Sequence, residues 1–239
     1  MSLVLFELRA AGGCAFSPYC WRARMALLHK GLSPELRPAR FTDIPKIGHG
    51  AKSLPVLLDG PIAILDSWDI ALYLEERYPE APSLFGGAAG RQFARFVHYW
   101  ATTQLHPAIV RMVAADIWER LDPDDQPYFR GTREQRLGAP LESFRAQQPT
   151  LLAQLGAALA PMRAMLAERP FLGGDEPAYA DYIVFGAFQW SRVISPVPLL
   201  PAGDAVQQWF ERCLDLHGGL GRRAAACVTE GSVGQSWIF

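Results

Sequence analysis

The chain has 239 residues, a formal net charge of −1 and 50% hydrophobic residues. This length fits one large domain or two small ones, and the balance of apolar and charged residues is typical of a globular protein. The near-neutral charge excludes the basic footprint expected of a nucleic-acid-binding or anionic-membrane-binding protein. We identify neither a targeting segment nor an apolar run long enough to cross a membrane, and we therefore expect a cytoplasmic protein.

Four cysteines are too few for a disulfide framework in a chain of this length; they are Cys14, Cys20, Cys213 and Cys227. We expect them to be reduced, as is usual in a cytosolic protein. No two of them form the CxxC pair typical of zinc sites, so we expect no metal.

The first 80 residues alternate short strand patterns and helix patterns. Ser17 and Pro18 are an N-cap and a first-turn proline, which predict a helix that ends at the basic residues before Gly31. Pro38 confines the second strand to a sheet edge, because proline cannot donate to a central ladder. We expect strands at 4–8, 36–41, 55–58 and 62–65, and helices at 18–29 and 68–78.

Residues 81–90 are rich in proline and glycine, which indicates a linker. Beyond them the spacing of apolar residues is helical. Pro107 and Pro161 are expected to kink or break the helices that contain them. We expect helices at 91–118, 150–168, 179–194 and 205–217, and a long loop with some helix over 121–149.

The segment from Cys14 to Cys20 carries the sharpest chemical signal. A strand, a tight loop and a helix start would place Ser17 where backbone N–H groups and the helix dipole stabilise an anion. A thiolate held there would have its pKa lowered from the free value of about 8.5. The alternative is that Ser17 only caps the helix.

Two further segments complete the pattern. Leu54 precedes Pro55 at a strand start, where a cis peptide bond would expose a backbone edge to an extended peptide. Asp66 and Ser67 begin another helix and could bind the ammonium and carboxylate of an amino acid. Each segment alone is also explained by ordinary strand initiation or helix capping. Together they favour a small thiol peptide as ligand.

The chain resembles the cytosolic glutathione S-transferases. The resemblance covers nearly the whole sequence and implies a thioredoxin-like α/β domain at 1–80, a linker at 81–90 and an all-helical domain at 91–239. It also implies a homodimer and a hydrophobic acceptor bound between the domains. Among family members the motifs look most like those of the bacterial β-etherase-like and fungal ether-related enzymes. The matching motifs are Ser17-Pro18-Tyr19, Leu54-Pro55-Val56, Asp66-Ser67-Trp68, Leu172-Gly173-Gly174-Asp175, Ala180-Asp181-Tyr182 and Leu214-Asp215-Leu216.

The resemblance also implies residue roles. Ser17 would hold the glutathione sulfur as a thiolate that attacks an electrophilic carbon or the ether-bearing carbon of an aryl ether. Leu54, ahead of a cis Pro55, would pair its backbone with the cysteinyl part, and Asp66 and Ser67 would hold the γ-glutamyl group. Lys52 is a candidate for the glycine carboxylate, with Lys46 and His49 as alternatives.

Cys14 stands where some bacterial family members form a mixed disulfide with glutathione. It is therefore a candidate redox residue, and a Cys14-dependent disulfide reductase or deglutathionylase is the alternative function. Cys20 is expected to be a buried hydrophobe. A non-catalytic binding protein is a third possibility, because fold alone does not determine function.

The expected acceptor pocket lies between the two domains. Arg111 and His106 are weaker candidates for contact with a polar substrate, because solvated or core positions are more usual for such residues. The candidate wall residues are Tyr19, Trp100, Gln104, Met112 and the C-terminal residues 237–239.

Overall fold

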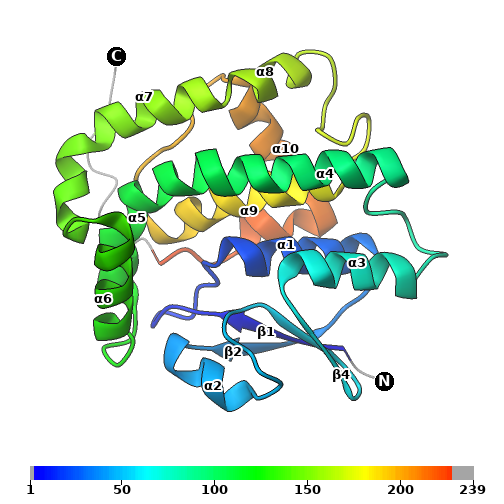
Figure 1. The fold of residues 1–239 in the computed structure, drawn as a ribbon. Coiled ribbons are helices and arrows are strands. Elements are labelled where there is room, and N and C mark those ends of the chain that lie inside the picture. Colours follow the sequence, from blue (N-terminus) through cyan, green and yellow to red (C-terminus); the bar gives the residue numbers. More distant parts are fainter. Residues whose placement is uncertain (1–2, 228–239) are drawn as a thin grey trace.

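The computed structural model describes residues 3–227, and Figure 1 shows their fold. The N-terminal part contains a four-stranded mixed sheet in the order β2-β1-β3-β4. Strand β1 pairs parallel with β2 and antiparallel with β3, which forms a hairpin with β4. The strands are β1 (Leu3–Leu8), β2 (Glu35–Ala39), β3 (Val56–Asp59) and β4 (Ile62–Leu65).

Strand β2 lies at the edge of the sheet, as its proline predicts. Three helices accompany the sheet: α1 (Pro18–His29), the short α2 (Ile44–Ile47) and α3 (Ser67–Arg77). Helices α1 and α3 lie between the sheet and the helical part (Figure 1). The sheet and helices form a thioredoxin-like unit, as expected.

The rest of the described chain is helical (Figure 1). Helix α9 is almost entirely buried and packs along α1, so it joins the helical part to the sheet part. Gly186 is required at this crossing, because a Cβ there would lie 2.4 Å from the Pro18 carbonyl oxygen. The helices are α4 (Ala88–Trp100), α5 (His106–Arg120), α6 (Gln126–Leu137), α7 (Gln148–Ala158), α8 (Ala160–Leu166), α9 (Tyr179–Ile194) and α10 (Ala205–Arg223).

Asp181 organises the start of α9. Its buried carboxylate accepts hydrogen bonds from the backbone N–H groups of Leu172 (2.8 Å), Gly173 (2.9 Å) and Ala178 (3.0 Å). It also accepts one from the indole N–H of Trp209 at 2.8 Å. These four donors satisfy a buried charge and tie the loop before α9 to α10.

The prolines act where the sequence predicts. The helix expected over 91–118 is interrupted by a π-helical turn, Ala101–Leu105, directly before Pro107 in the first turn of α5. Proline has no N–H for the preceding turn, and the wider turn accommodates its ring. Pro161 likewise begins α8 after α7 ends at Ala158.

Over 121–149 the expected long loop is wrong, and the helix expected within it is present and longer than the sequence indicates. Most of this range forms α6 and a 3-10 segment, Leu141–Gln147. Helix α6 is polar except for buried Phe129, so it has little apolar periodicity, and it ends at Gly138 in the left-handed conformation. Helix α4 begins at Ala88, inside the expected linker, and α10 has non-helical backbone from Leu216, close to its expected end.

The expectation of reduced cysteines is also wrong for two of the four. Cys14 and Cys227 form a disulfide across 213 residues of sequence, whereas Cys20 and Cys213 are free and buried. Helices of the described chain are all too short or too polar to cross a membrane.

Candidate functional site

A cavity of about 500 Å³ lies where the sheet part meets the helical part. Its walls come from the loop before α1, the loop before β3, the α4–α5 junction and α6. The first turn of α1 adds two residues, and β1, the 3-10 segment Phe41–Asp43, α2 and α9 add one each. The lining residues are Leu8, Phe16, Ser17, Pro18, Tyr19, Phe41, Ile44, Lys52, Ser53, Leu54, Thr102, His106, Pro107, Val110, Arg111, Ile117, Tyr128, Phe129, Arg133, Arg136, Leu137 and Trp190.

Ser17 is the polar group at the start of α1. Its Oγ accepts a hydrogen bond from the Cys20 backbone N–H at 3.3 Å, so it is the helix N-cap, and its side chain is also part of the cavity wall. The capping and functional interpretations therefore coexist. A serine hydroxyl both donates and accepts, so Ser17 can cap the helix and still donate to an anion in the cavity.

The peptide bond between Leu54 and Pro55 is cis. Neither the N–H nor the C=O of Leu54 has a hydrogen-bond partner in the part of the chain that the structure describes. Leu54 lies in the cavity wall directly before β3. Its backbone is therefore available to an extended ligand.

Of the three basic candidates, Lys52 lines the cavity. The ammonium group of Lys46 instead lies 3.0 Å from Asp43 Oδ1 in an ion pair. His49 is exposed and is not among the lining residues. The position of Lys52 therefore makes it the best placed of the three to meet a ligand carboxylate.

Asp66 and Ser67 form the second helix start. Asp66 Oδ1 accepts from the Trp68 backbone N–H at 2.7 Å and caps α3, while the Asp66 backbone has φ = 130°, a strained conformation for a non-glycine residue. Ser67 is fully buried, and its Oγ has no hydrogen-bond partner among the described residues. A strained cap beside an unsatisfied hydroxyl is typical of a binding position.

A buried cation lies one turn into α1. The Arg22 guanidinium is fully buried, lies 4.6 Å from the Tyr19 ring centre, and contacts His106 Nε2 at 3.0 Å and His98 Nδ1 at 3.4 Å. Burial, and then the charge of Arg22, lower the pKa of both histidines, that of His98 to about 4. Both histidines are therefore neutral near pH 7 and add no positive charge beside Arg22, whose guanidinium is stabilised by the negative charge of Asp66.

The structure corrects most of the expected acceptor wall. Tyr19 lines the cavity, but Trp100, Gln104 and Met112 do not. Gln104 is exposed and Met112 is buried in the core, and Trp100 is two positions before the lining residue Thr102. A shift of two residues turns a side chain to the opposite side of a helix. The lining residues of this junction are Thr102, His106, Pro107, Val110 and Arg111, and the tail 237–239 lies outside the described residues.

Helix α6 supplies a wall that the sequence interpretation missed. Phe129, Arg133 and Arg136 lie on this helix and line the cavity. The available signal was the spacing of Arg133 and Arg136, because residues three apart share one side of a helix.

Neither cysteine near Ser17 has an available thiolate in this structure. Cys14 is buried and bonded to Cys227, so it has no thiol for a mixed disulfide. Burial raises the pKa of Cys20 to about 12, which agrees with its expected role as a buried small hydrophobe.

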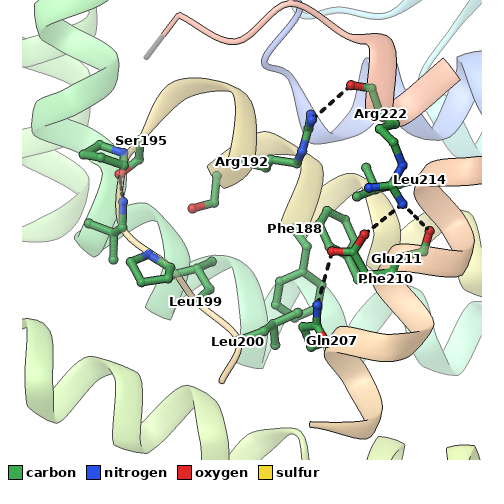
Figure 2. A pocket seen from close by; sticks show the side chains of 14 residues that line it. Phe188, Arg192, Ser195, Leu199, Leu200, Gln207, Phe210, Glu211, Leu214 and Arg222 are labelled. Atoms are coloured by element: carbon green, nitrogen blue, oxygen red, sulfur yellow. Dashed lines mark hydrogen bonds and ion pairs between the residues drawn. The ribbon is translucent and has the colours of Figure 1, made fainter. Parts of the chain in front are cut away.

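A second cavity of about 390 Å³ lies between α9 and α10, on the helical part alone (Figure 2). Arg222 closes one side and pairs with Glu211 at 2.8 Å and Asp215 at 2.6 Å. Arg192 donates to the backbone carbonyls of Gly221 and Arg222. The cationic groups around this cavity are therefore already paired within the protein.

Two family models match the chain: "Glutathione S-transferase, N-terminal domain" over residues 13–82 and "Glutathione S-transferase, C-terminal domain" over residues 93–215. A curated relative, the glutathione S-transferase-like protein ustS of Aspergillus flavus, is 29% identical over 144 residues, or 54% of this chain and 51% of the relative. Glutathione S-transferase Z1 of Arabidopsis thaliana is 40% identical over 70 residues, or 26% and 31%. The matches thus span about half or less of these relatives.

Similar solved structures cover far more of the chain. Glutathione transferase GSTFuA3 of Phanerochaete chrysosporium has a TM-score of 0.73 at 27% identity and covers 92% of both chains. CsGST63524 of Ceriporiopsis subvermispora, solved in complex with glutathione, has a TM-score of 0.74 at 20% identity and covers 93% of this chain and 94% of its own. The chain therefore belongs to the glutathione S-transferase family.

Proposed function

We propose that the protein is a serine-type glutathione transferase. In this proposal Ser17 donates its hydroxyl proton in a hydrogen bond to the glutathione sulfur and stabilises the thiolate. The N–H groups at the start of α1 and the buried Arg22 charge favour the same anion. The observation that carries the proposal is the position of Ser17, at a helix start and in the wall of a 500 Å³ cavity.

The remaining polar groups would orient the peptide. The free backbone of Leu54, held by the cis bond to Pro55, would pair with the cysteinyl unit. Asp66 would pair with the γ-glutamyl ammonium, and the unsatisfied Ser67 hydroxyl would donate to its carboxylate. Lys52 would meet the glycine carboxylate.

The acceptor would be a hydrophobic electrophile in the same cavity, next to Tyr19. The thiolate attacks an electrophilic carbon, a C–S bond forms, and the leaving group departs with the bonding electron pair. For an aryl ether, which the motifs favour, the C–O bond breaks and an aryloxide leaves. The protein contributes a lower thiol pKa and a fixed orientation.

Three earlier expectations remain proposals. A homodimer is typical of the family, and analytical ultracentrifugation would give twice the protomer mass. A cytoplasmic location is tested by fractionation, since a disulfide such as Cys14–Cys227 is more usual in oxidising compartments. The Cys14-dependent redox function requires this disulfide to be opened first.

Calorimetric titration of the purified chain with glutathione tests the binding half of the proposal, and saturable binding is expected. Reaction of glutathione with a panel that includes β-aryl ethers and 1-chloro-2,4-dinitrobenzene, followed by mass spectrometry, tests the transfer. Absence of binding at millimolar glutathione would refute the proposal.

A further inference from the structure

The charged side chains that line the first cavity are all cationic. Its lining includes four cationic side chains, Lys52, Arg111, Arg133 and Arg136, and no aspartate or glutamate among the described residues. Aromatic and apolar side chains form the rest of the wall beside them, among them Phe41 and Phe129. A neutral hydrophobic acceptor would need only those apolar walls. The cations therefore need a separate explanation.

Arg133 is the most constrained of the four. Its guanidinium lies 5.4 Å from the Phe41 ring centre and 4.8 Å from that of Phe129, and it donates to Thr132 Oγ1 at 2.9 Å. No carboxylate of the described chain forms an ion pair with it. Burial is the main cause that lowers its pKa, and the charge of Arg136 adds to the effect. A guanidinium held between aromatic rings without an anion is incompletely compensated.

Arg136 and Arg111 extend the positive surface from α6 to α5. Neither forms an ion pair with a carboxylate in residues 3–227, and Arg111 donates only to the Pro107 carbonyl oxygen, at 2.9 Å. Arg136 and His106 line the same cavity, and the charge of Arg136 also contributes to lowering the pKa of His106. Trp190, in the same wall, has an indole N–H without an acceptor among the described residues.

The second cavity provides an internal contrast. There Arg222 is paired with Glu211 and Arg192 with the Arg222 carbonyl group (Figure 2). Arg222 also pairs with Asp215, and Arg192 with the Gly221 carbonyl group. Elsewhere on α6, Arg130 is paired with Glu134 and Glu142. Arg222 and Arg130 are thus paired with carboxylates, whereas none of the three arginines that line the first cavity forms an ion pair with a carboxylate among the described residues.

We propose that the acceptor of this enzyme carries a negatively charged group, such as a carboxylate, on an aromatic body, and that Arg133 and Arg136 of α6 bind that group. The inference rests on the proposed transferase function and adds the charge of its substrate. The planar guanidinium groups suit a bidentate contact with a carboxylate, and the neighbouring rings suit an aromatic body. Lys52 keeps its proposed role of binding the glycine carboxylate of glutathione.

The test uses a pair of probes that differ in charge. In 4-chloro-3-nitrobenzoate and 4-chloro-3-nitrobenzamide the thiolate attacks the chlorine-bearing carbon, a C–S bond forms, and chloride leaves with the electron pair. The thiol proton goes to solvent. Each enzymatic rate is divided by the uncatalysed rate with glutathione, which corrects for the different reactivities of the two rings. The affinities of the two glutathione conjugates are measured separately by calorimetry.

The variants are Arg136→Gln and Arg133→Gln. Arg130→Gln on the same helix is the control, because Arg130 does not line the cavity and pairs with Glu134 and Glu142. Arg136 is exposed, so its substitution leaves folding intact even if the Arg133 variant is unstable. We expect Arg136→Gln to lower kcat/KM for the benzoate about tenfold, or about 1.4 kcal/mol, and to change that for the benzamide by less than about twofold. The conjugate affinities should change in parallel, and Arg136→Lys should restore part of the loss.

The outcomes separate the inference from the proposed function. Equal losses for both probes, or a higher KM for glutathione with no change in preference between probes, would overturn the inference. In the second case the arginines bind the glycine carboxylate of glutathione instead. If neither probe is turned over, the transferase proposal fails for these acceptors. Tighter binding of the charged conjugate, lost in the arginine variants, would then still support the anion site.

Discussion

Ser67→Ala is expected to change stability and ligand binding in opposite directions. Ser67 is fully buried at the first position of α3, and its hydroxyl has no partner among the described residues. The helix cap is supplied by Asp66, so removal of the hydroxyl leaves the cap in place. The variant therefore removes only a buried hydroxyl that has no hydrogen-bond partner and destabilises the ligand-free protein.

The magnitudes follow from that burial. Removal of an unsatisfied buried hydroxyl, together with the better helix propensity of alanine, should raise the free energy of unfolding by about 1 kcal/mol. A hydrogen bond to a charged carboxylate contributes about 1.5–3 kcal/mol, so the Kd for glutathione should rise about 10-fold to 150-fold.

Denaturant unfolding of the ligand-free protein and calorimetric titration with glutathione measure the two effects. Ser83→Ala is the matched control, because the Ser83 hydroxyl accepts from the N–H groups of Phe85 and Gly86, away from the cavity. It should lower stability by about 1 kcal/mol without changing glutathione affinity. An unchanged Kd in Ser67→Ala, or a clear loss of its stability, would refute the reasoning.

Three further predictions concern the buried polar groups. In Asp181→Asn an amide NH₂ group replaces one carboxylate oxygen and faces N–H groups that need an acceptor. The free energy of unfolding should decrease by about 3 kcal/mol. A decrease below about 1 kcal/mol in denaturant unfolding would contradict this. His98 has a folded pKa of about 4, below its ordinary 6.5, so the unfolded chain binds more protons between these values. The pKa of His106 is lowered in the same direction. The free energy of unfolding should therefore be highest above pH 6.5 and should decrease as the pH is lowered toward 4. In His98→Gln this decrease should be smaller. Thiol titration in denaturant without reductant should count two thiols, Cys20 and Cys213, and four would contradict the disulfide.

The secondary-structure elements that the sequence predicts well are those whose signals lie within a single segment. The strands at 4–8 and 62–65 and the helix at 18–29 match the structure to within a residue, because apolar patterns, an N-cap and turn residues lie within each segment. Their own segments left open the isomer of the bond before Pro55 and the role of Ser17 beyond capping. The family resemblance implied the cis bond and the binding role, and the structure has a cis bond there and Ser17 in the cavity wall.

The missed features depend on contacts between distant segments. Helix α6 is mostly polar and buries only Phe129, so apolar periodicity does not reveal its packing over the cavity. Cys227 meets Cys14 across 213 residues, and sequence alone cannot pair them. The acceptor wall was placed on the wrong face of α4 and α5, because the π-helical turn and the packing of α9 determine which side faces the cavity.

The pKa of glutathione bound to the protein tests the central claim most directly. The thiolate absorbs in the far ultraviolet, so a pH titration of the complex reports its ionisation. The account predicts a bound thiol pKa at least about one unit below the free value of about 8.5, and a return toward that value in Ser17→Ala, whose glutathione binding should persist. A bound thiol that titrates at the free value in the wild-type protein, or an unchanged pKa in Ser17→Ala, would contradict the assignment of Ser17.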